Sequence, residues 1–350
     1  MRILIAEDDT ALASFVRQGL QGEHYTVDVA EDGEQARAMG SEVDYDLVIL
    51  DLGLPRLDGV AVLRHLRLRR PSLPVLVLTL RSRVEDRVQC LDTGADDYVP
   101  KQLSSTSLDI LHLRDRLIAK IKAAAESRRS REPQICLRKP PQAVALSRRQ
   151  GPLSVPSIVA VGTSTGGPKA LQEILPLLPA ELPVPILIVQ HMPMGFTGPF
   201  ARRLNNLCAI SICEAIHGET IKPGTAYIAP AGSHLTVDRT SSRTSICLCN
   251  KPENQLHVPS IDIMMESVAS AFRASAMGII LTGMGSDGAL GMSAIHQKGG
   301  LTVGQDKESC AVYGMPRACA EMRIVDRVVP LSQIPNEILQ ATRYRRTSAS

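Results

Sequence analysis

Short apolar runs alternate with helical patterns along the first 125 residues. Between the runs, apolar residues recur every three or four positions, which predicts amphipathic helices. The runs are 3–6, 26–30, 47–50, 75–78 and the shorter 98–99, and the predicted helices lie near 10–20, 33–40, 58–69, 84–93 and 106–124. Continuous apolar strands that alternate with helices predict a parallel sheet covered on both faces.

The second half of the chain repeats this alternation from residue 153 onwards. Its predicted strands are 157–161, 186–189, 226–229, 235–237, 244–248, 278–282 and 301–303. Helical patterns follow near 168–178, 197–207, 260–275, 288–297 and 332–343. The region between 225 and 250 looks like an antiparallel excursion from an otherwise parallel sheet. We therefore predict a second α/β domain.

Between the two halves, residues 126–152 lose apolar periodicity and become rich in Arg, Ser and Pro. Such a composition is typical of a linker. The basic residues could contact an acidic partner, but a solvated tether is the commoner role for such runs. The expected organisation is a first domain over 1–125, a linker over 126–152 and a second domain over 153–345.

Composition narrows the class of protein. The chain has 350 residues, of which 44% are hydrophobic and 21% charged, as in globular proteins. An acidic stretch close to the N-terminus and the lack of any 18-residue apolar run predict a cytoplasmic protein without membrane insertion. The eight cysteines are scattered, which suggests reduced structural thiols. A net charge of +3, no Trp and 3% aromatic residues argue against nucleic-acid binding. We expect a monomer.

Acidic and basic residues follow the strands of the first domain, where the carboxyl ends of parallel strands meet at one edge. Glu7, Asp8 and Asp9 follow the first strand, Asp51 the third, Thr79 the fourth and Lys101 the fifth. Converging carboxylates repel one another unless a cation lies among them, and Mg²⁺ prefers such oxygen ligands. Solvated loop acids are the alternative, but fitting chemistry at four of the five strand ends favours a phosphoryl site.

These residues lie in motifs that resemble those of the response-regulator receiver family. The matching stretches are Ile3-Leu-Ile-Ala-Glu-Asp-Asp9, Asp46-Leu-Val-Ile-Leu-Asp-Leu-Gly-Leu-Pro-Arg-Leu-Asp-Gly59, Val84-Glu-Asp-Arg87 and Thr93-Gly-Ala-Asp-Asp-Tyr-Val-Pro-Lys101. The resemblance implies a flavodoxin-like (βα)5 fold. It also implies Asp51 as phospho-acceptor, Glu7, Asp8 and Asp51 as Mg²⁺ ligands, Thr79 and Tyr98 as a switch pair, and Lys101 as a phosphate contact.

One position departs from the receiver pattern. The family's lysine normally precedes a proline in a cis bond, whereas here Gln102 follows Lys101. Because a non-proline residue strongly prefers a trans peptide bond, this departure bears on the geometry of Lys101 and on the coupling of the switch.

In the second domain a predicted strand runs directly into a turn rich in Gly, Ser and Thr and then into a helix. The stretch is Ser157-Ile-Val-Ala-Val-Gly-Thr-Ser-Thr-Gly-Gly-Pro-Lys-Ala170. Ser164 lies in a Gly-x-Ser-x-Gly turn between strand and helix, which is the pattern of a nucleophile elbow. A plain turn or a phosphate cradle fits this short pattern as well, so a serine nucleophile needs a base and an acid elsewhere.

Two residues at other strand ends could supply that base and acid. His191 follows the apolar run 186–189, and Asp287 lies in a glycine-rich loop after 278–282, so both should reach the same edge of the sheet as Ser164. The glycine pattern Gly283-x-Gly285-x-x-Gly288, with Asp306 further on, also matches a dinucleotide-binding fingerprint. That alternative leaves Ser164 and His191 without a role.

The second domain resembles the chemotaxis methylesterase family (CheB type). Besides the stretch around Ser164, the resemblance is carried by Val189-Gln-His-Met-Pro-Met-Gly-Phe-Thr-Gly198, Pro223-Gly-Thr-Ala-Tyr-Ile-Ala-Pro-Ala-Gly-Ser-His234, Pro259-Ser-Ile-Asp262, Leu281-Thr-Gly-Met-Gly-Ser-Asp-Gly-Ala289 and Tyr313-Gly-Met-Pro-Arg317. It implies a Rossmann-like, doubly wound, mainly parallel hydrolase domain with Ser164 as nucleophile, His191 as base and Asp287 as orienting acid. Thr165 and the backbone N–H of Met284 would help to bind substrate and oxyanion.

The resemblance also implies the reaction and its partners. The substrates would be γ-glutamyl methyl esters on chemoreceptors, with deamidation of receptor glutamines as a second activity. A histidine kinase of the CheA type would phosphorylate Asp51, with Mg²⁺ at the receiver, and ester hydrolysis itself would need no cofactor. The alternative is a signalling module that binds partners with a relic triad. A DNA-binding regulator is not favoured, because the second domain has no helix-turn-helix pattern.

Overall fold

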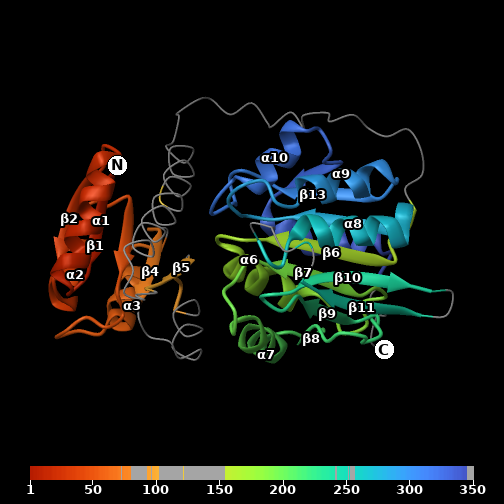
Figure 1. The fold of residues 1–350 in the computed structure, drawn as a ribbon, viewed down its shortest axis with the longest axis horizontal. Coiled ribbons are helices and arrows are strands. Elements are labelled where there is room, and N and C mark those ends of the chain that lie inside the picture. Colours follow the sequence, from red (N-terminus) through yellow and green to blue (C-terminus); the bar gives the residue numbers. More distant parts are fainter. Residues whose placement is uncertain are drawn as a thin grey trace, which may run out of the picture. The chain divides into compact units, whose positions relative to one another are not determined.

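The chain forms two compact units, Met1–Glu132 and Pro133–Ser350 (Figure 1). The computed structural model describes residues 1–71, 73–79, 93–95, 97–101, 121, 154–240, 243–250, 252 and 257–344, with the backbone alone at 79 and 97–100. The helix predicted near 84–93, nearly all of that near 106–124, Gln102 and the linker 126–152 lie outside these residues.

The first unit contains the predicted five-stranded parallel sheet. The strands are β1 (Arg2–Ala6), β2 (Thr26–Ala30), β3 (Leu47–Leu50), β4 (Val75–Thr79) and β5 (Asp97–Pro100). Their order across the sheet is β2-β1-β3-β4-β5, which is the flavodoxin-like order, and every pairing is parallel. The described helices are α1 (Thr10–Gly22), α2 (Gly33–Glu42) and α3 (Gly59–Arg69). The predicted fold of this unit is confirmed.

Each of these helices is preceded by an aspartate whose side chain accepts hydrogen bonds from the first turn. Asp9 caps α1, Asp32 caps α2 and Asp58 caps α3. Such a cap satisfies backbone N–H groups that have no partner inside the helix. Because Asp9 is held in this way, it is Glu7 and Asp8 that remain beside Asp51.

The second unit contains a seven-stranded sheet in which all pairings are parallel. Across the sheet the order is β14-β13-β12-β6-β7-β9-β8. The strands are β6 (Ile158–Thr163), β7 (Ile186–Gln190), β8 (Ser211–Glu214), β9 (Thr225–Ile228), β12 (Ala276–Ile280), β13 (Leu301–Gln305) and β14 (Arg327–Val329). The chain starts in the middle at β6, winds first towards β8 and later towards β14. The winding therefore reverses between β6 and β12, where open α/β sheets bind their ligands.

Two hydrophobic cores cover the two faces of this sheet. Alternate residues of β6 divide between them, since Val159 and Val161 belong to one core, and Ile158 and Ala160 to the other. The first core contains residues of α6 (Gly167–Ile174), α7 (Thr197–Leu207) and α11 (Ile334–Ala341), and the second those of α8 (Ile261–Phe272), α9 (Ala289–Gln297) and α10 (Met315–Glu321). Figure 1 shows α8 and α9 on the side of the sheet opposite to α6 and α7. The doubly wound arrangement is thus confirmed.

The antiparallel excursion is a hairpin of β10 (His234–Arg239) and β11 (Thr244–Cys249), which forms a sheet of its own. β9, in contrast, joins the main sheet in parallel. Among the described elements, three were not predicted, namely β8, β14 and α10. The two strands have only four and three residues and form the edges of the sheet, and α10 has seven residues, so none shows a clear periodicity.

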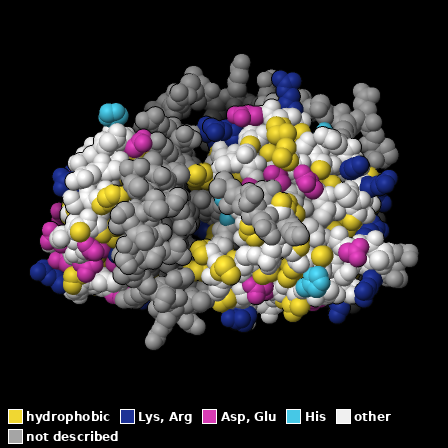
Figure 2. Space-filling view, in the orientation of Figure 1, with side chains coloured by type: hydrophobic (Ala, Val, Ile, Leu, Met, Phe, Trp, Pro, Cys, Tyr) yellow, Lys and Arg dark blue, Asp and Glu magenta, His cyan; other side chains and the backbone are white. Residues whose placement is uncertain are grey.

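Charged side chains of both signs are interspersed on the surface of the described residues seen in Figure 2. This mixture agrees with the net charge of +3. Within the part of the chain that the structure describes, no helix has both the length and the hydropathy needed to cross a bilayer.

Candidate functional site

Ser164 lies in a tight turn between β6 and α6. Its backbone N–H donates to Thr282 O (3.1 Å), and its carbonyl accepts from the N–H of Gly167 (2.8 Å). Gly166 has φ of +79°, a conformation that glycine adopts at little cost, and a side chain there would meet Ala311 at 2.5 Å. The turn thus presents a half-buried serine above the sheet, just before the N-terminus of a helix.

His191 follows the last residue of β7, and its ring pairs with Asp287. The His191 Nε2 to Asp287 Oδ2 distance is 2.8 Å, and each of the two side chains is 10% exposed. Asp287 follows β12 in the glycine-rich loop. The structure therefore brings together two of the three predicted side chains from strands on either side of β6.

Asp287 is held by four donors. Besides His191, it accepts hydrogen bonds from the N–H of Ile261 (2.8 Å) and of Asp262 (3.1 Å), and from the Ser260 hydroxyl (2.9 Å). Burial alone would raise the pKa of Asp287, but the hydrogen bonds from His191 and from the start of α8 outweigh burial and lower the pKa below its usual 3.8. Asp287 is therefore an ionised carboxylate at neutral pH.

The other ring nitrogen of His191, Nδ1, is buried and has no hydrogen-bond partner among the described residues. The ring stacks on that of His257, with centroids 4.2 Å apart and planes inclined by 16°. Within the described part of the chain, no hydrogen bond joins the Ser164 hydroxyl to His191. The backbone of His191 does bind the residue before Ser164, since the N–H of His191 donates to Thr163 O (3.1 Å).

Thr165 and Met284 lie on segments that border Ser164. The Thr165 carbonyl accepts from the Thr282 hydroxyl (2.9 Å), and a side chain on Gly283 would come within 2.9 Å of Ser164 Cβ. The Gly283 carbonyl accepts from Gly314 (3.0 Å) and Met315 (2.9 Å), which fixes this loop. Among the described residues, the N–H of Met284 donates to no acceptor.

In the first unit, three carboxylates and a lysine gather at the carboxyl edge of the sheet. Ligand oxygens of Glu7, Asp8 and Asp51 lie within 4.8 Å of one another. The ammonium of Lys101 is 2.7 Å from Glu7 Oε1 and 2.7 Å from Asp51 Oδ2, and Lys101 is only 6% exposed. Burial raises the pKa of Glu7 despite Lys101, and the two carboxylates raise the pKa of Lys101 despite its burial. This donor set fits a hard divalent cation.

Comparison with known proteins identifies both units. Residues 159–338 match the CheB methylesterase family, and residues 3–111 match the response regulator receiver domain. Protein-glutamate methylesterase/protein-glutamine glutaminase 2 of Nitratidesulfovibrio vulgaris is 39% identical over 363 residues, which cover 96% of this chain and 98% of the relative. The chain belongs to the CheB methylesterase family.

Other members agree with this assignment. Protein-glutamate methylesterase/protein-glutamine glutaminase 1 of Geobacter sulfurreducens is 36% identical over 351 residues, covering 97% of this chain and 96% of its own. The crystal structure of the Thermotoga maritima CheB methylesterase catalytic domain is 37% identical and has a TM-score of 0.52, covering 53% of this chain and 99% of that chain. This chain is therefore an enzyme of the protein-glutamate methylesterase/protein-glutamine glutaminase class with a receiver domain, whose acidic cluster of Glu7, Asp8 and Asp51 is typical of a Mg²⁺ site.

Membership of the CheB family favours the hydrolase interpretation of the glycine-rich loop over the dinucleotide alternative. Asp306 would be the ribose-binding acid of that alternative. Its carboxylate accepts hydrogen bonds from the backbone N–H (3.0 Å) and the hydroxyl (2.6 Å) of Ser309. Asp287, which lies in the glycine-rich loop, is hydrogen-bonded to His191 and to the start of α8. The carboxylates of Asp306 and Asp287 thus both bind groups of the protein itself.

Some residues of the site were not singled out in the sequence. The family motif includes the segment 259–262 but indicates no role for its residues, yet Ser260, Ile261 and Asp262 hold Asp287. A serine before an apolar run is a helix-cap signal and could have marked Ser260. His257 lies in a polar stretch of the sequence, and no local pattern there indicates that its ring stacks on His191.

Asp262 links α8 to α9 beside Asp287. Its carboxylate accepts from the N–H of Gly291 in α9 (2.8 Å), while its own N–H binds Asp287. Burial, together with the like charge of Asp287, raises the pKa of Asp262 to about 6. The pKa values of the two neighbouring carboxyls are therefore shifted in opposite directions, and Asp287 is the one that stays ionised.

Two predicted switch residues have only their backbones described. Thr79 ends β4 and Tyr98 lies in β5, where β4 and β5 pair in parallel. Their side chains lie outside the described part of the structure, as does Gln102. Lys101 is described, and its ammonium lies between Glu7 and Asp51.

Apolar side chains are exposed along the edge of the sheet that carries the site. Met194 lies three residues after His191 and is 75% exposed, and Leu290 lies three residues after Asp287 and is 60% exposed. Figure 2 shows hydrophobic side chains gathered on the visible face of the second unit.

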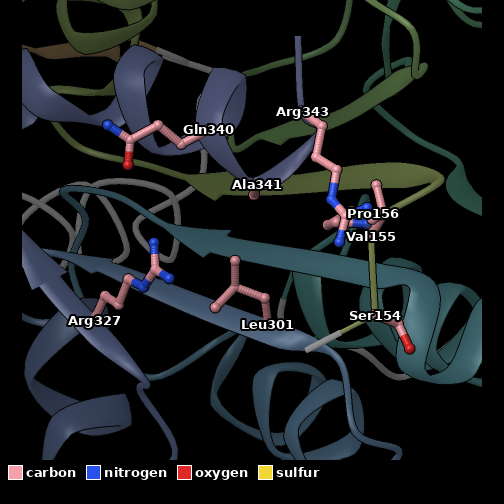
Figure 3. A pocket seen from close by; sticks show the side chains of 8 residues that line it. All are labelled: Ser154, Val155, Pro156, Leu301, Arg327, Gln340, Ala341 and Arg343. Atoms are coloured by element: carbon pink, nitrogen blue, oxygen red, sulfur yellow. The ribbon is translucent and has the colours of Figure 1, made fainter. Parts of the chain in front are cut away.

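A cavity of about 310 Å³ lies elsewhere in the second unit (Figure 3). It is lined by Leu301, which begins β13, and by Val155 and Pro156, which precede β6, so it lies at the amino ends of the strands. Arg327 and Arg343 flank it, and Arg327 is paired with Glu337 at 2.5 Å. This cavity is at the opposite edge of the sheet from Ser164.

Proposed function

We propose that Ser164, His191 and Asp287 hydrolyse γ-glutamyl methyl esters through an acyl-enzyme. The Ser164 oxygen attacks the ester carbonyl while His191 takes its proton, and the tetrahedral intermediate collapses to glutamyl-serine. Methanol leaves with the proton from His191. Water then attacks the glutamyl-serine with His191 as base, which restores the serine and releases the glutamate side chain.

The hydrogen bond between His191 Nε2 and Asp287 carries this proposal. An ionised acid on Nε2 holds the ring proton there, so Nδ1 is the nitrogen that can accept a proton from serine. Nδ1 is buried and has no hydrogen-bond partner within the described residues, as expected of a base that is to accept the proton of Ser164. The assignment is the reverse of the serine proteases, in which the acid binds Nδ1.

The oxyanion would be held by backbone groups next to the nucleophile. The N–H of Met284 donates to no acceptor in the described residues, and its loop is fixed by two hydrogen bonds to Gly283 O. Thr165 immediately follows Ser164 and lies two residues before α6 begins at Gly167. Fixed N–H donors near a helix N-terminus stabilise a developing negative charge without having to reorient.

The proposed substrates are methylated glutamates on chemoreceptors, with receptor glutamines as substrates for deamidation. Relatives named protein-glutamate methylesterase/protein-glutamine glutaminase cover the chain almost end to end, which supports both activities. A protein substrate needs a surface as well as a pocket, and the exposed Met194 and Leu290 beside the site suit contact with an apolar helix face.

The receiver would regulate the esterase through Asp51. Glu7, Asp8 and Asp51 would hold Mg²⁺, which neutralises the charge of the phosphoryl group when bound. Lys101 would contact that group from between Glu7 and Asp51. A histidine kinase of the CheA type would donate the phosphoryl group, and Thr79 and Tyr98 would relay the change. Phosphorylation is expected to raise esterase activity.

The first domain spans 1–125, a tether of residues 126–152 follows, and the catalytic domain spans 153–345. The protein acts as a cytoplasmic monomer.

The test is methanol release from membranes that carry methylated chemoreceptors. We expect turnover by the full chain, a higher rate after treatment with acetyl phosphate and Mg²⁺, and no turnover by Ser164→Ala. Turnover by Ser164→Ala at the wild-type rate would remove the serine from the mechanism. Binding to receptors without turnover would favour the non-catalytic signalling module.

A further inference from the structure

Gln190 connects the backbones of two proposed catalytic residues. It is the last residue of β7 and is 1% exposed. Its Nε2 lies 3.0 Å from the carbonyl oxygen of Ser164 and 2.9 Å from that of His191. An atom that faces two carbonyl oxygens must be the amide nitrogen, because an amide oxygen there would be repelled by both.

We propose that Gln190 is a positioning residue of the esterase site, whose side-chain amide fixes the backbone of Ser164 relative to the backbone of His191. This role rests on the function proposed above, which makes Ser164 the nucleophile and His191 the base. Gln190 does not act on substrate, since both N–H groups of its amide are used by these two carbonyls.

The opposite end of the amide shows that this position is not optimised for stability. Gln190 Oε1 is buried and has no hydrogen-bond partner among the described residues. An unpaired buried carbonyl costs about 1–3 kcal/mol, which an apolar side chain of similar size would avoid. What glutamine offers here, and leucine or methionine cannot, is the pair of N–H donors.

The neighbouring backbone is shaped to admit the amide. A side chain on Gly167 would lie 2.0 Å from Gln190 Oε1 and 2.4 Å from Thr163 Oγ1. Glycine at the first position of α6 therefore leaves the space that Gln190 fills.

The Gln190 amide makes its hydrogen bonds just beyond the point where the backbone pairing of β6 with β7 ends. Thr163 and Gln190 are the last paired residues of β6 and β7, and one further bond joins His191 N to Thr163 O. Ser164 and His191 both lie beyond the strands, on segments that turn away. The Gln190 amide is the link that joins Ser164 itself to His191. Displacing a reacting group by about 1 Å can lower the rate about 100-fold.

Two substitutions remove the link in different ways. Gln190→Met keeps the length of the side chain but has no donor, and Gln190→Glu keeps the shape but places a carboxylate against two carbonyl oxygens. We expect kcat for receptor demethylation to fall about 10- to 100-fold in Gln190→Met and further in Gln190→Glu. KM should stay within about threefold, because substrate contacts are intact. Labelling of Ser164 by a fluorophosphonate should slow in step with kcat.

Thr302→Val is the matched control. Thr302 lies near the amino end of β13 and is 0% exposed, and its hydroxyl donates to Asp326 Oδ2 (2.8 Å) and accepts from the N–H of Asp326 (3.0 Å). The variant loses buried hydrogen bonds, as Gln190→Met does, but at the edge of the sheet opposite to Ser164. We expect a similar loss of unfolding free energy and a kcat within about threefold of wild type.

All rates are expressed per folded molecule, from urea unfolding of each variant. If Gln190→Met does not fold, Gln190→Asn replaces it, since its shorter amide can reach only one of the two carbonyls. A wild-type kcat in a folded Gln190 variant would overturn the positioning role, and so would a raised KM at unchanged kcat or an equal loss of kcat in Thr302→Val. Ser164→Ala is assayed alongside. If it keeps turnover, the proposed function fails, whereas an inactive Ser164→Ala beside a fully active Gln190→Met refutes only the role of Gln190.

Discussion

Replacing Asp287 by asparagine should separate its catalytic role from its structural one. The carboxylate accepts four hydrogen bonds, two on each oxygen: His191 Nε2 and Ile261 N on Oδ2, and Ser260 Oγ and Asp262 N on Oδ1. In Asp287→Asn, whichever oxygen becomes NH₂ then faces a backbone N–H of α8. One buried donor must lose its acceptor in either orientation.

The loss of one buried hydrogen-bond acceptor sets the expected loss of stability of Asp287→Asn. An unsatisfied buried donor costs about 1–3 kcal/mol, and losing a negative charge at a helix N-terminus adds about 0.3–1 kcal/mol. We expect the unfolding free energy to fall by about 2–3 kcal/mol at pH 7. Because the pKa of Asp287 is held below its usual 3.8, its stabilisation is present above about pH 3.8 and is lost as the pH falls through the lower folded pKa. Wild type should therefore lose stability more steeply in acid than Asp287→Asn does.

The catalytic loss should be much larger. If the new NH₂ donates to His191 Nε2, the ring proton moves to Nδ1, which can then no longer accept the serine proton. In the serine proteases the corresponding change lowers kcat about 10⁴-fold. If the NH₂ instead faces Asp262, the tautomer survives and only the negative charge is lost. We expect a fall in kcat of about 10³- to 10⁴-fold.

Asp326→Asn is the matched control for methanol release and urea unfolding. Asp326 accepts from the N–H (2.9 Å) and the hydroxyl (2.8 Å) of Thr302, and lies 3.5 Å from His296 Nδ1. It should lose comparable stability with kcat within about twofold. The reasoning is refuted if folded Asp287→Asn keeps more than about a tenth of wild-type kcat, or if Asp326→Asn loses as much.

Three further predictions concern the neighbourhood of the two sites. Gly167→Ala should lose about 1–3 kcal/mol of unfolding free energy in urea, because the added carbon would lie 2.0 Å from Gln190 Oε1; an unchanged urea midpoint would contradict this packing. Asp262→Asn should become more stable relative to wild type as pH rises from 4 to 7, because the raised folded pKa of about 6 means that wild type loses stability through this window; parallel urea midpoints across that range would count against it. Asp51→Asn, or removal of Mg²⁺ by EDTA, should abolish labelling by ³²P-acetyl phosphate; a label retained on Asp51→Asn would place the phosphoryl group elsewhere.

The sequence predicted the central strands well because their residues are buried on both faces. β6 and β7 are continuous apolar runs, and each delivers a polar residue, Ser164 or His191, at its carboxyl end. The edge strands β8 and β14 were missed, since they are short and partly exposed. α10 begins with Met315-Pro316 and is too short to show a hydrophobic face.

The candidate site was predictable in its residues but not in its contacts. Strand order places Ser164, His191 and Asp287 on one edge, which the spacing of motifs could indicate. Which imidazole nitrogen binds Asp287, the stacking of His257 and the reach of Gln190 depend on side-chain rotamers and on loops that meet only in the folded chain. Such tertiary contacts leave no periodic pattern in the sequence.

Mass spectrometry of the chain after reaction with a fluorophosphonate tests the proposed nucleophile most directly. We predict one label per folded molecule, on the peptide that contains Ser164, no label in Ser164→Ala, and labelling of His191→Ala slowed by at least about 100-fold. A label on another residue, or rapid labelling of Ser164 without the imidazole of His191, would contradict a serine activated by histidine.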